Sequence, residues 1–95
     1  MLVVFIAYYS PEQYEVLLKR ADDRKKLDDK WQDWFSGFLK LKTFLQGEFV
    51  VEDFHVDVQK MHDYFIRNKL KNTSSNRAKY VSEEGERSYK KNIII

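Results

Sequence analysis

The chain has 95 residues, with 17 Lys and Arg against 15 Asp and Glu, and it has no cysteine. This length suits one domain, because a chain this short cannot divide into two self-supporting cores. The lack of cysteine excludes disulfides and thiolate zinc sites, and two histidines separated by six residues, His55 and His62, make a poor metal set. We therefore expect no metal and no cofactor. Oligomerisation is the remaining way to stabilise a core this small.

The charge is distributed unevenly. Residues 1–65 carry nine Lys and Arg against twelve Asp and Glu, whereas residues 66–95 carry eight against three. The apolar run LVVFIAYY near the N-terminus is too short to cross a membrane, and it resembles no signal peptide. We expect a cytoplasmic protein with no membrane partner. Its basic final third either adds solubility or meets an acidic partner, namely nucleic acid or an acidic protein surface.

The first two elements are a strand and a helix. Residues 2–8, LVVFIAY, are rich in β-branched and aromatic residues without alternation, which predicts a central strand buried on both faces. Ser10 then suits the N-cap of a helix, Pro11 its first position, and Gln13 the capping-box position from which a side chain reaches back to the cap amide.

The rest of the chain predicts three further helices and one further strand. A break near residues 22–27 precedes a helix over about 28–46, and residues 48–56 form a second, less buried strand at the edge of the sheet. Asp57 caps a third helix. A short fourth helix begins near Ser74 and ends at Gly85.

These elements give the order β-α-α-β-α-α in an α/β or α+β fold, with helices packed on a small, mainly parallel sheet. Residues 1–85 form one compact domain, and residues 86–95 form a basic and then apolar tail. Two strands alone rarely make a stable sheet, so a third strand is expected. Either the tail supplies it within the chain, or a partner supplies it in an exchanged dimer.

The predicted second helix carries an aromatic seam. Leu27, Trp31, Trp34, Phe38, Leu41 and Leu45 follow a four-three spacing, and further apolar side chains widen the stripe beyond what a small sheet can cover. A second subunit would cover the excess. The predicted homodimer interface comprises Trp31, Trp34, Phe35, Phe38, Leu39 and Phe44.

A small-ligand or enzymatic site is predicted where the two strands end. In a parallel sheet, ligands bind beyond the carboxyl ends of the strands, near helix N-termini. That geometry would bring together Tyr8, Ser10, His55 and Asp57. A histidine near a carboxylate and a hydroxyl resembles an acid–base set, but Ser10 and Asp57 also fit the role of helix caps.

The basic final third could bind nucleic acid, because it mixes cations with rings that stack on bases. Glu83, Glu84 and Glu86 lie in the same region and would repel phosphates. The predicted contact residues are Arg67, Lys69, Lys71, Arg77, Lys79, Tyr80, Arg87, Lys90 and Lys91. No nucleophile motif or phosphate-binding loop is present in the sequence.

Taken together, the sequence favours a non-catalytic protein-interaction or small regulatory module that acts as a homo-oligomer, because its distinctive residues are suited to packing rather than to reaction chemistry. Nucleic-acid binding is the alternative, and a ligand or enzymatic site at the strand ends is the third.

Overall fold

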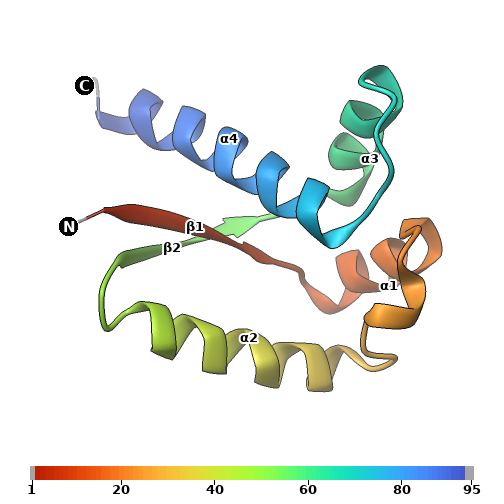
Figure 1. Ribbon diagram of the computed structural model, residues 1–95, viewed down its shortest axis with the longest axis horizontal. Helices are drawn as coiled ribbons and strands as arrows, with labels where there is room; N and C mark the ends of the chain where they lie inside the picture. Colours follow the sequence, from red (N-terminus) through yellow and green to blue (C-terminus); the bar gives the residue numbers. More distant parts are fainter. Residues whose placement is uncertain (1, 94–95) are drawn as a thin grey trace.

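The computed structural model describes the backbone of residues 2–93 and the side chains of residues 2–89. The elements are β1 (Val3–Tyr8), α1 (Pro11–Arg20), a short 3-10 helix (Arg24–Lys26), α2 (Trp31–Leu45), β2 (Val50–His55), α3 (Val58–Arg67) and α4 (Ser74–Ile93) (Figure 1). The predicted element order and fold class are confirmed. Within the described residues, no helix has the length and apolar character needed to span a membrane.

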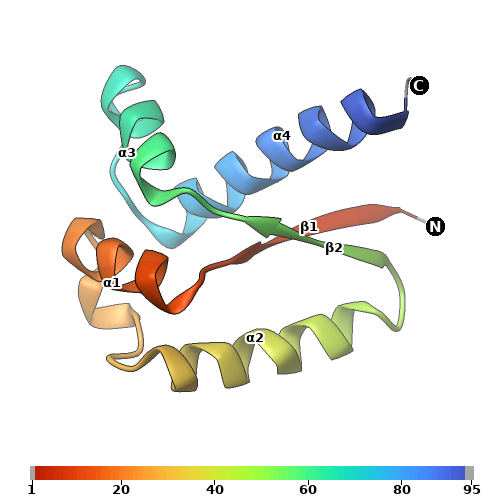
Figure 2. The same cartoon turned by 180° about the vertical axis from the view of Figure 1, so that it is seen from behind.

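The two strands pair in parallel, with a register that runs from Val3 opposite Val50 to Tyr8 opposite His55. Figures 1 and 2 show α4 on one side of the strands and α2 on the other, with α1 and α3 beyond the carboxyl ends of the strands. The order β1-β2 leaves the outer edge of each strand unpaired among the described residues. β1 is therefore an edge strand, and the prediction that it is central is wrong for this part of the chain.

Side-chain alternation explains why β1 is nevertheless covered on both faces. Tyr8 points toward α2, where its ring centroid lies 5.6 Å from that of Phe38. Phe5 points toward α4, with its ring 5.9 Å from that of Tyr89. The run LVVFIAY lacks polar alternation because helices cover both faces of the sheet, without a further strand on the outer edge.

The buried core lies where the strand ends meet α1, α3 and α4. The side chains of Tyr14, Leu17, Val58, Met61 and Val81 are each at most 1% exposed. Since these residues come from α1, α3 and α4, the core joins the three helices into one unit.

Both predicted caps are confirmed, but the predicted capping box is wrong. Ser10 Oγ accepts a hydrogen bond from Gln13 N at 3.2 Å, and Asp57 Oδ1 accepts one from Lys60 N at 3.2 Å. Gln13 does not reach back to the cap amide. Its side-chain oxygen accepts from Val58 N at 2.7 Å, so it links α1 to the first turn of α3.

The prediction that the last helix ends at Gly85 is also wrong. α4 continues through this residue to Ile93. A Cβ at Gly85 would lie 2.5 Å from Cγ of Phe5, so the glycine is needed for the close approach of α4 to β1. Residues 86–93 are helical, and the strand predicted for the tail does not form there; Ile94 and Ile95 lie outside the described residues.

Candidate functional site

The residues predicted at the strand ends meet only in part. The rings of Tyr8 and His55 are paired across the strands, with centroids 4.9 Å apart. Ser10 and Asp57 instead direct their oxygen atoms to the first turns of α1 and α3. Both residues thus serve as N-caps of these two helices.

The aromatic seam of α2 faces mainly inward. The ring of Trp34 lies 5.5 Å from that of Tyr9 and 5.3 Å from that of Phe38, and Trp31 Nε1 donates to the carbonyl oxygen of Tyr9 at 2.8 Å. Phe35 is half-buried and stacks 4.8 Å from Trp31. Of the six residues predicted for a dimer interface, four therefore pack within the molecule.

The other two, Leu39 and Phe44, are exposed at 46% and 79% of their surface. Leu41, predicted as part of the inward seam, is 49% exposed. The C-terminal part of α2, from Leu39 to Phe44, thus presents apolar surface that nothing in the described chain covers.

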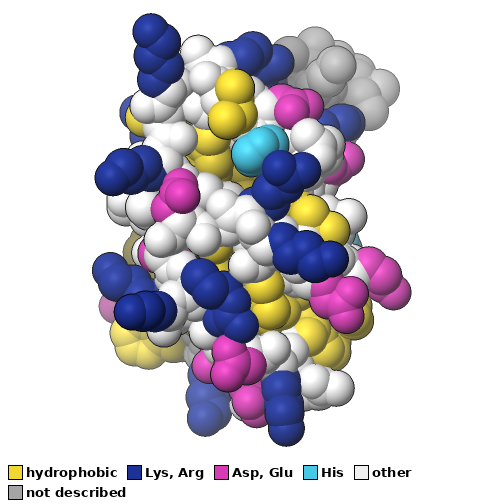
Figure 3. Space-filling view, turned by 90° about the vertical axis from the view of Figure 1, so that its right-hand side faces the viewer, with side chains coloured by type: hydrophobic (Ala, Val, Ile, Leu, Met, Phe, Trp, Pro, Cys, Tyr) yellow, Lys and Arg dark blue, Asp and Glu magenta, His cyan; other side chains and the backbone are white. Residues whose placement is uncertain are grey.

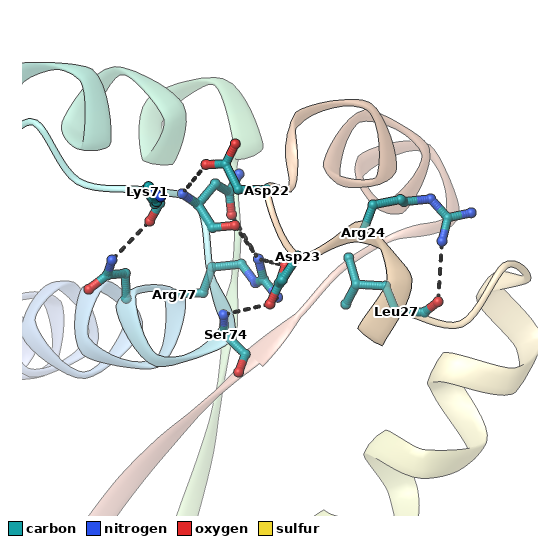
Figure 4. Close-up of polar contacts among 9 residues, drawn as sticks. Asp22, Asp23, Arg24, Leu27, Lys71, Ser74 and Arg77 are labelled. Carbon is teal, nitrogen blue, oxygen red and sulfur yellow. Dashed lines mark hydrogen bonds and ion pairs between the residues drawn. The ribbon is translucent and has the colours of Figure 1, made fainter.

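Arg77, predicted to contact nucleic acid, is buried in an ion pair. Its guanidinium donates to both carboxylate oxygens of Asp23, at 2.9 and 3.0 Å, and also to the backbone and side-chain oxygens of Asn72 at 3.1 and 2.8 Å. Figure 4 shows Arg77 of α4 and Asp23, which follows α1, pointing toward one another. Ser74 N donates to the same carboxylate at 2.9 Å. This cluster ties the end of α1 to the start of α4, and because Arg77 is only 6% exposed, its guanidinium is not accessible to a phosphate.

Burial acts on the pKa values of both Asp23 and Tyr9, but the net shifts of the two groups have opposite directions. Burial acts to raise the pKa of Asp23, but the hydrogen bonds and charge of Arg77 outweigh it and hold that pKa below its usual value. Tyr9 is 4% exposed, and burial raises its pKa to about 12. Asp23 is therefore a carboxylate and Tyr9 a neutral phenol near neutral pH.

On the face that Figure 3 shows, the described basic residues do not form one positive surface. Figure 3 shows Lys and Arg spread among acidic and apolar side chains on the end of the molecule near α1 and α3. A groove of about 320 Å³ between α3 and α4 is lined by Lys60, Asp63, Tyr64, Arg67, Tyr80, Glu84 and Arg87. Arg87 is paired with Glu84 at 2.7 Å. This groove gathers three of the predicted nucleic-acid contacts, but its acidic members offset much of its positive charge. The side chains of Lys90 and Lys91 lie outside the described residues.

A second groove, which the sequence did not predict, follows the outer edge of β1. It consists of two adjoining hollows of about 300 and 310 Å³, and both are lined by Ile6, Ala7, Trp34 and Leu41. α2 forms one wall and α4 the other, and the wall from α4 includes Ala78. The need for a third strand pointed to this edge, but the sequence did not show that both helices would leave it open.

Within the described residues, no group of three or more His, Asp and Glu side chains is placed to hold a metal ion. Comparison of the chain with protein-family models, with curated proteins and with solved structures gave no match. Function therefore has to be inferred from the geometry of the chain itself.

Proposed function

We propose that this protein is a non-catalytic interaction module that acts as a homo-oligomer. The observation that carries the proposal is the uncovered apolar surface of α2 beside the outer edge of β1, where the exposed Leu41 lines the groove and the exposed Phe44 lies about one helical turn further along α2. Contiguous apolar surface of this kind marks protein–protein interfaces, and a two-stranded sheet gains stability from further strands. The use of Ser10 and Asp57 as helix caps supports a role without catalysis.

Sedimentation equilibrium over a range of protein concentrations tests this function. The wild-type protein is expected to show a reversible increase from monomer to dimer mass. Phe44→Glu places a charge on the apolar surface of α2 and should shift the protein toward monomer.

Ile66→Glu is the matched control, because Ile66 is 65% exposed but belongs to α3. It should leave the association unchanged. A wild-type protein that remains monomeric at every concentration would refute the proposed function.

A further inference from the structure

At the outer edge of β1, alternate residues carry backbone groups that no other described residue pairs with. The carbonyl oxygens of Leu2 and Tyr8 accept hydrogen bonds from Val50 N of β2 and from Val56 N, directly after β2, each at 3.0 Å. Because the direction of backbone polar groups alternates along a strand, those of Val3, Phe5 and Ala7 face away from β2. Beyond the strand, the odd-numbered Tyr9 confirms this direction, since its carbonyl accepts from a side chain of α2 and not from β2.

This edge also lacks the features that keep edge strands from pairing with other chains. β1 has the sequence VVFIAY, without a charged residue or a proline. β2 carries Glu52 and Asp53 in its middle, so its own free edge is flanked by charges. Charged residues are a usual means of preventing edge-to-edge contact. β1 is thus the edge suited to accept another strand.

The helices that flank the edge carry small residues on the sides that face the groove. In α2, Gly37 lines the groove, and a Cβ added there would meet no atom within 4 Å, so packing within the chain does not require the glycine. In α4, Ala78 lines the other wall and is exposed. A glycine in mid-helix lowers helix stability relative to alanine, so its presence needs another reason.

Sheet geometry supplies that reason. α2 and α4 each contact both strands. Lys42 of α2 pairs with Asp53 of β2 at 2.9 Å, and the ring of Tyr80 of α4 lies 6.3 Å from that of Phe54 of β2. If a second sheet continued the first, each helix would lie beside its own copy across the junction, and helix axes in such contacts are about 8 to 10 Å apart. Small residues on the facing sides permit this approach.

The charges on α2 fit a second copy of the same helix. Asp33 and Lys40 lie on either side of Gly37 on the exposed part of α2, and no ion pair within the described residues engages either of them. A two-fold axis perpendicular to the sheet makes the two α2 helices antiparallel, and where this axis passes beside Gly37 each Asp33 lies opposite Lys40 of the second copy. The contact is then self-complementary in charge, in shape and in backbone hydrogen bonding.

We propose that two copies of this chain pair antiparallel through β1 and form a continuous four-stranded sheet in the order β2-β1-β1-β2. This inference rests on the proposed function and names the partner and the site. The new hydrogen bonds engage the backbone groups of Val3, Phe5 and Ala7. The two α2 helices then lie side by side on one face of the sheet and the two α4 helices on the other.

Amide hydrogen exchange of the wild-type protein, followed by NMR, tests the pairing directly. At a concentration where sedimentation shows dimer, the amides of Phe5 and Ala7 should exchange at least about tenfold more slowly than after dilution to monomer, because hydrogen-bonded amides are protected. The amides of Ile6 and Tyr8, which face β2 in either state, serve as the internal reference. A dimer in which Phe5 and Ala7 exchange as fast as in the monomer would overturn the β1 pairing and leave the proposed self-association standing. A protein that never dimerises would overturn both.

Charge reversal tests the arrangement of the helices. Asp33→Lys and Lys40→Asp should each weaken dimerisation by about tenfold, because each places like charges opposite one another across the interface. The double variant should restore the wild-type association. Glu15→Lys, on the exposed side of α1, is the control and should have no effect. Failure of the double variant to recover any affinity would exclude the antiparallel placement of α2.

Discussion

The cluster of Asp23 and Arg77 supports the sharpest prediction about stability. The two side chains are only 9% and 7% exposed, and they join parts of the chain 54 residues apart. In Arg77→Met the side chain keeps its apolar length but loses the guanidinium, which leaves the Asp23 carboxylate buried with the Ser74 amide. Removal of one partner from a buried ion pair costs about 3 to 5 kcal/mol. We expect a loss of this size in the free energy of unfolding at pH 7.

The dependence on pH follows from the lowered pKa of Asp23. A carboxyl whose folded-state pKa lies below its unfolded value of 3.8 stabilises the fold above that value, and this contribution is lost as the pH falls through the folded pKa. In Arg77→Met the hydrogen bonds and positive charge of Arg77, which lower the pKa of Asp23, are lost while burial still raises it, so the carboxyl should take up its proton at a higher pH. The difference in stability between wild type and variant should therefore be largest near neutral pH and shrink in acid.

Urea denaturation followed by circular dichroism measures both effects. Arg87→Met is the matched control, because the Arg87 side chain is 71% exposed in its pair with Glu84 and should contribute only about 0 to 1 kcal/mol. The reasoning is refuted if Arg77→Met costs no more than this control at pH 7. A loss that stays the same in acid would contradict the assignment to Asp23.

Three further predictions concern other contacts. Gly85→Ala should lower the free energy of unfolding by about 1 to 3 kcal/mol, because the new methyl group overlaps Phe5. Gly37→Ala should instead raise the free energy of unfolding of the isolated monomer by about 1 kcal/mol, because a Cβ there meets no other atom. Thermal or urea unfolding of both variants measures this contrast, and equal effects would contradict it. In an alkaline absorbance titration, one phenol should ionise with a pKa of about 12, and this transition should be absent in Tyr9→Phe. Stability should fall as the pH rises above about 10, because between the two pKa values only the unfolded state releases this proton. Gln13→Ala should cost about 1 kcal/mol by leaving the first amide of α3 without its acceptor, and an unchanged urea midpoint would argue against that hydrogen bond.

Most features that depend on neighbouring residues could be predicted from the sequence alone. Ser10 and Asp57 act as N-caps, the element order is confirmed, and Trp34 and Phe38 face inward as their spacing indicates. These signals are short-range, because a cap bonds a backbone amide three residues away and a helical stripe repeats within two turns.

Contacts between distant segments were decided by the tertiary structure. Gly85 has the sequence signature of a helix end, yet it lies within α4. A glycine is required there because Phe5 of β1 occupies the space where a side chain would be. Arg77 belongs to a basic segment that looks like exposed surface, yet it is buried against Asp23. Both outcomes depend on which elements the fold places side by side. The pattern of nearby residues does not encode that information.

The candidate site shows the same division. The uncharged sequence of β1 determined that this strand would be covered on both faces, and the count of two strands led to the expectation of a third. Only the tertiary structure placed α2 and α4 on opposite faces and left the outer edge of β1 open between Gly37 and Ala78. The physical reason is that the hydrogen-bonding capacity of a strand is local, whereas its access to a partner depends on how the helices pack around it.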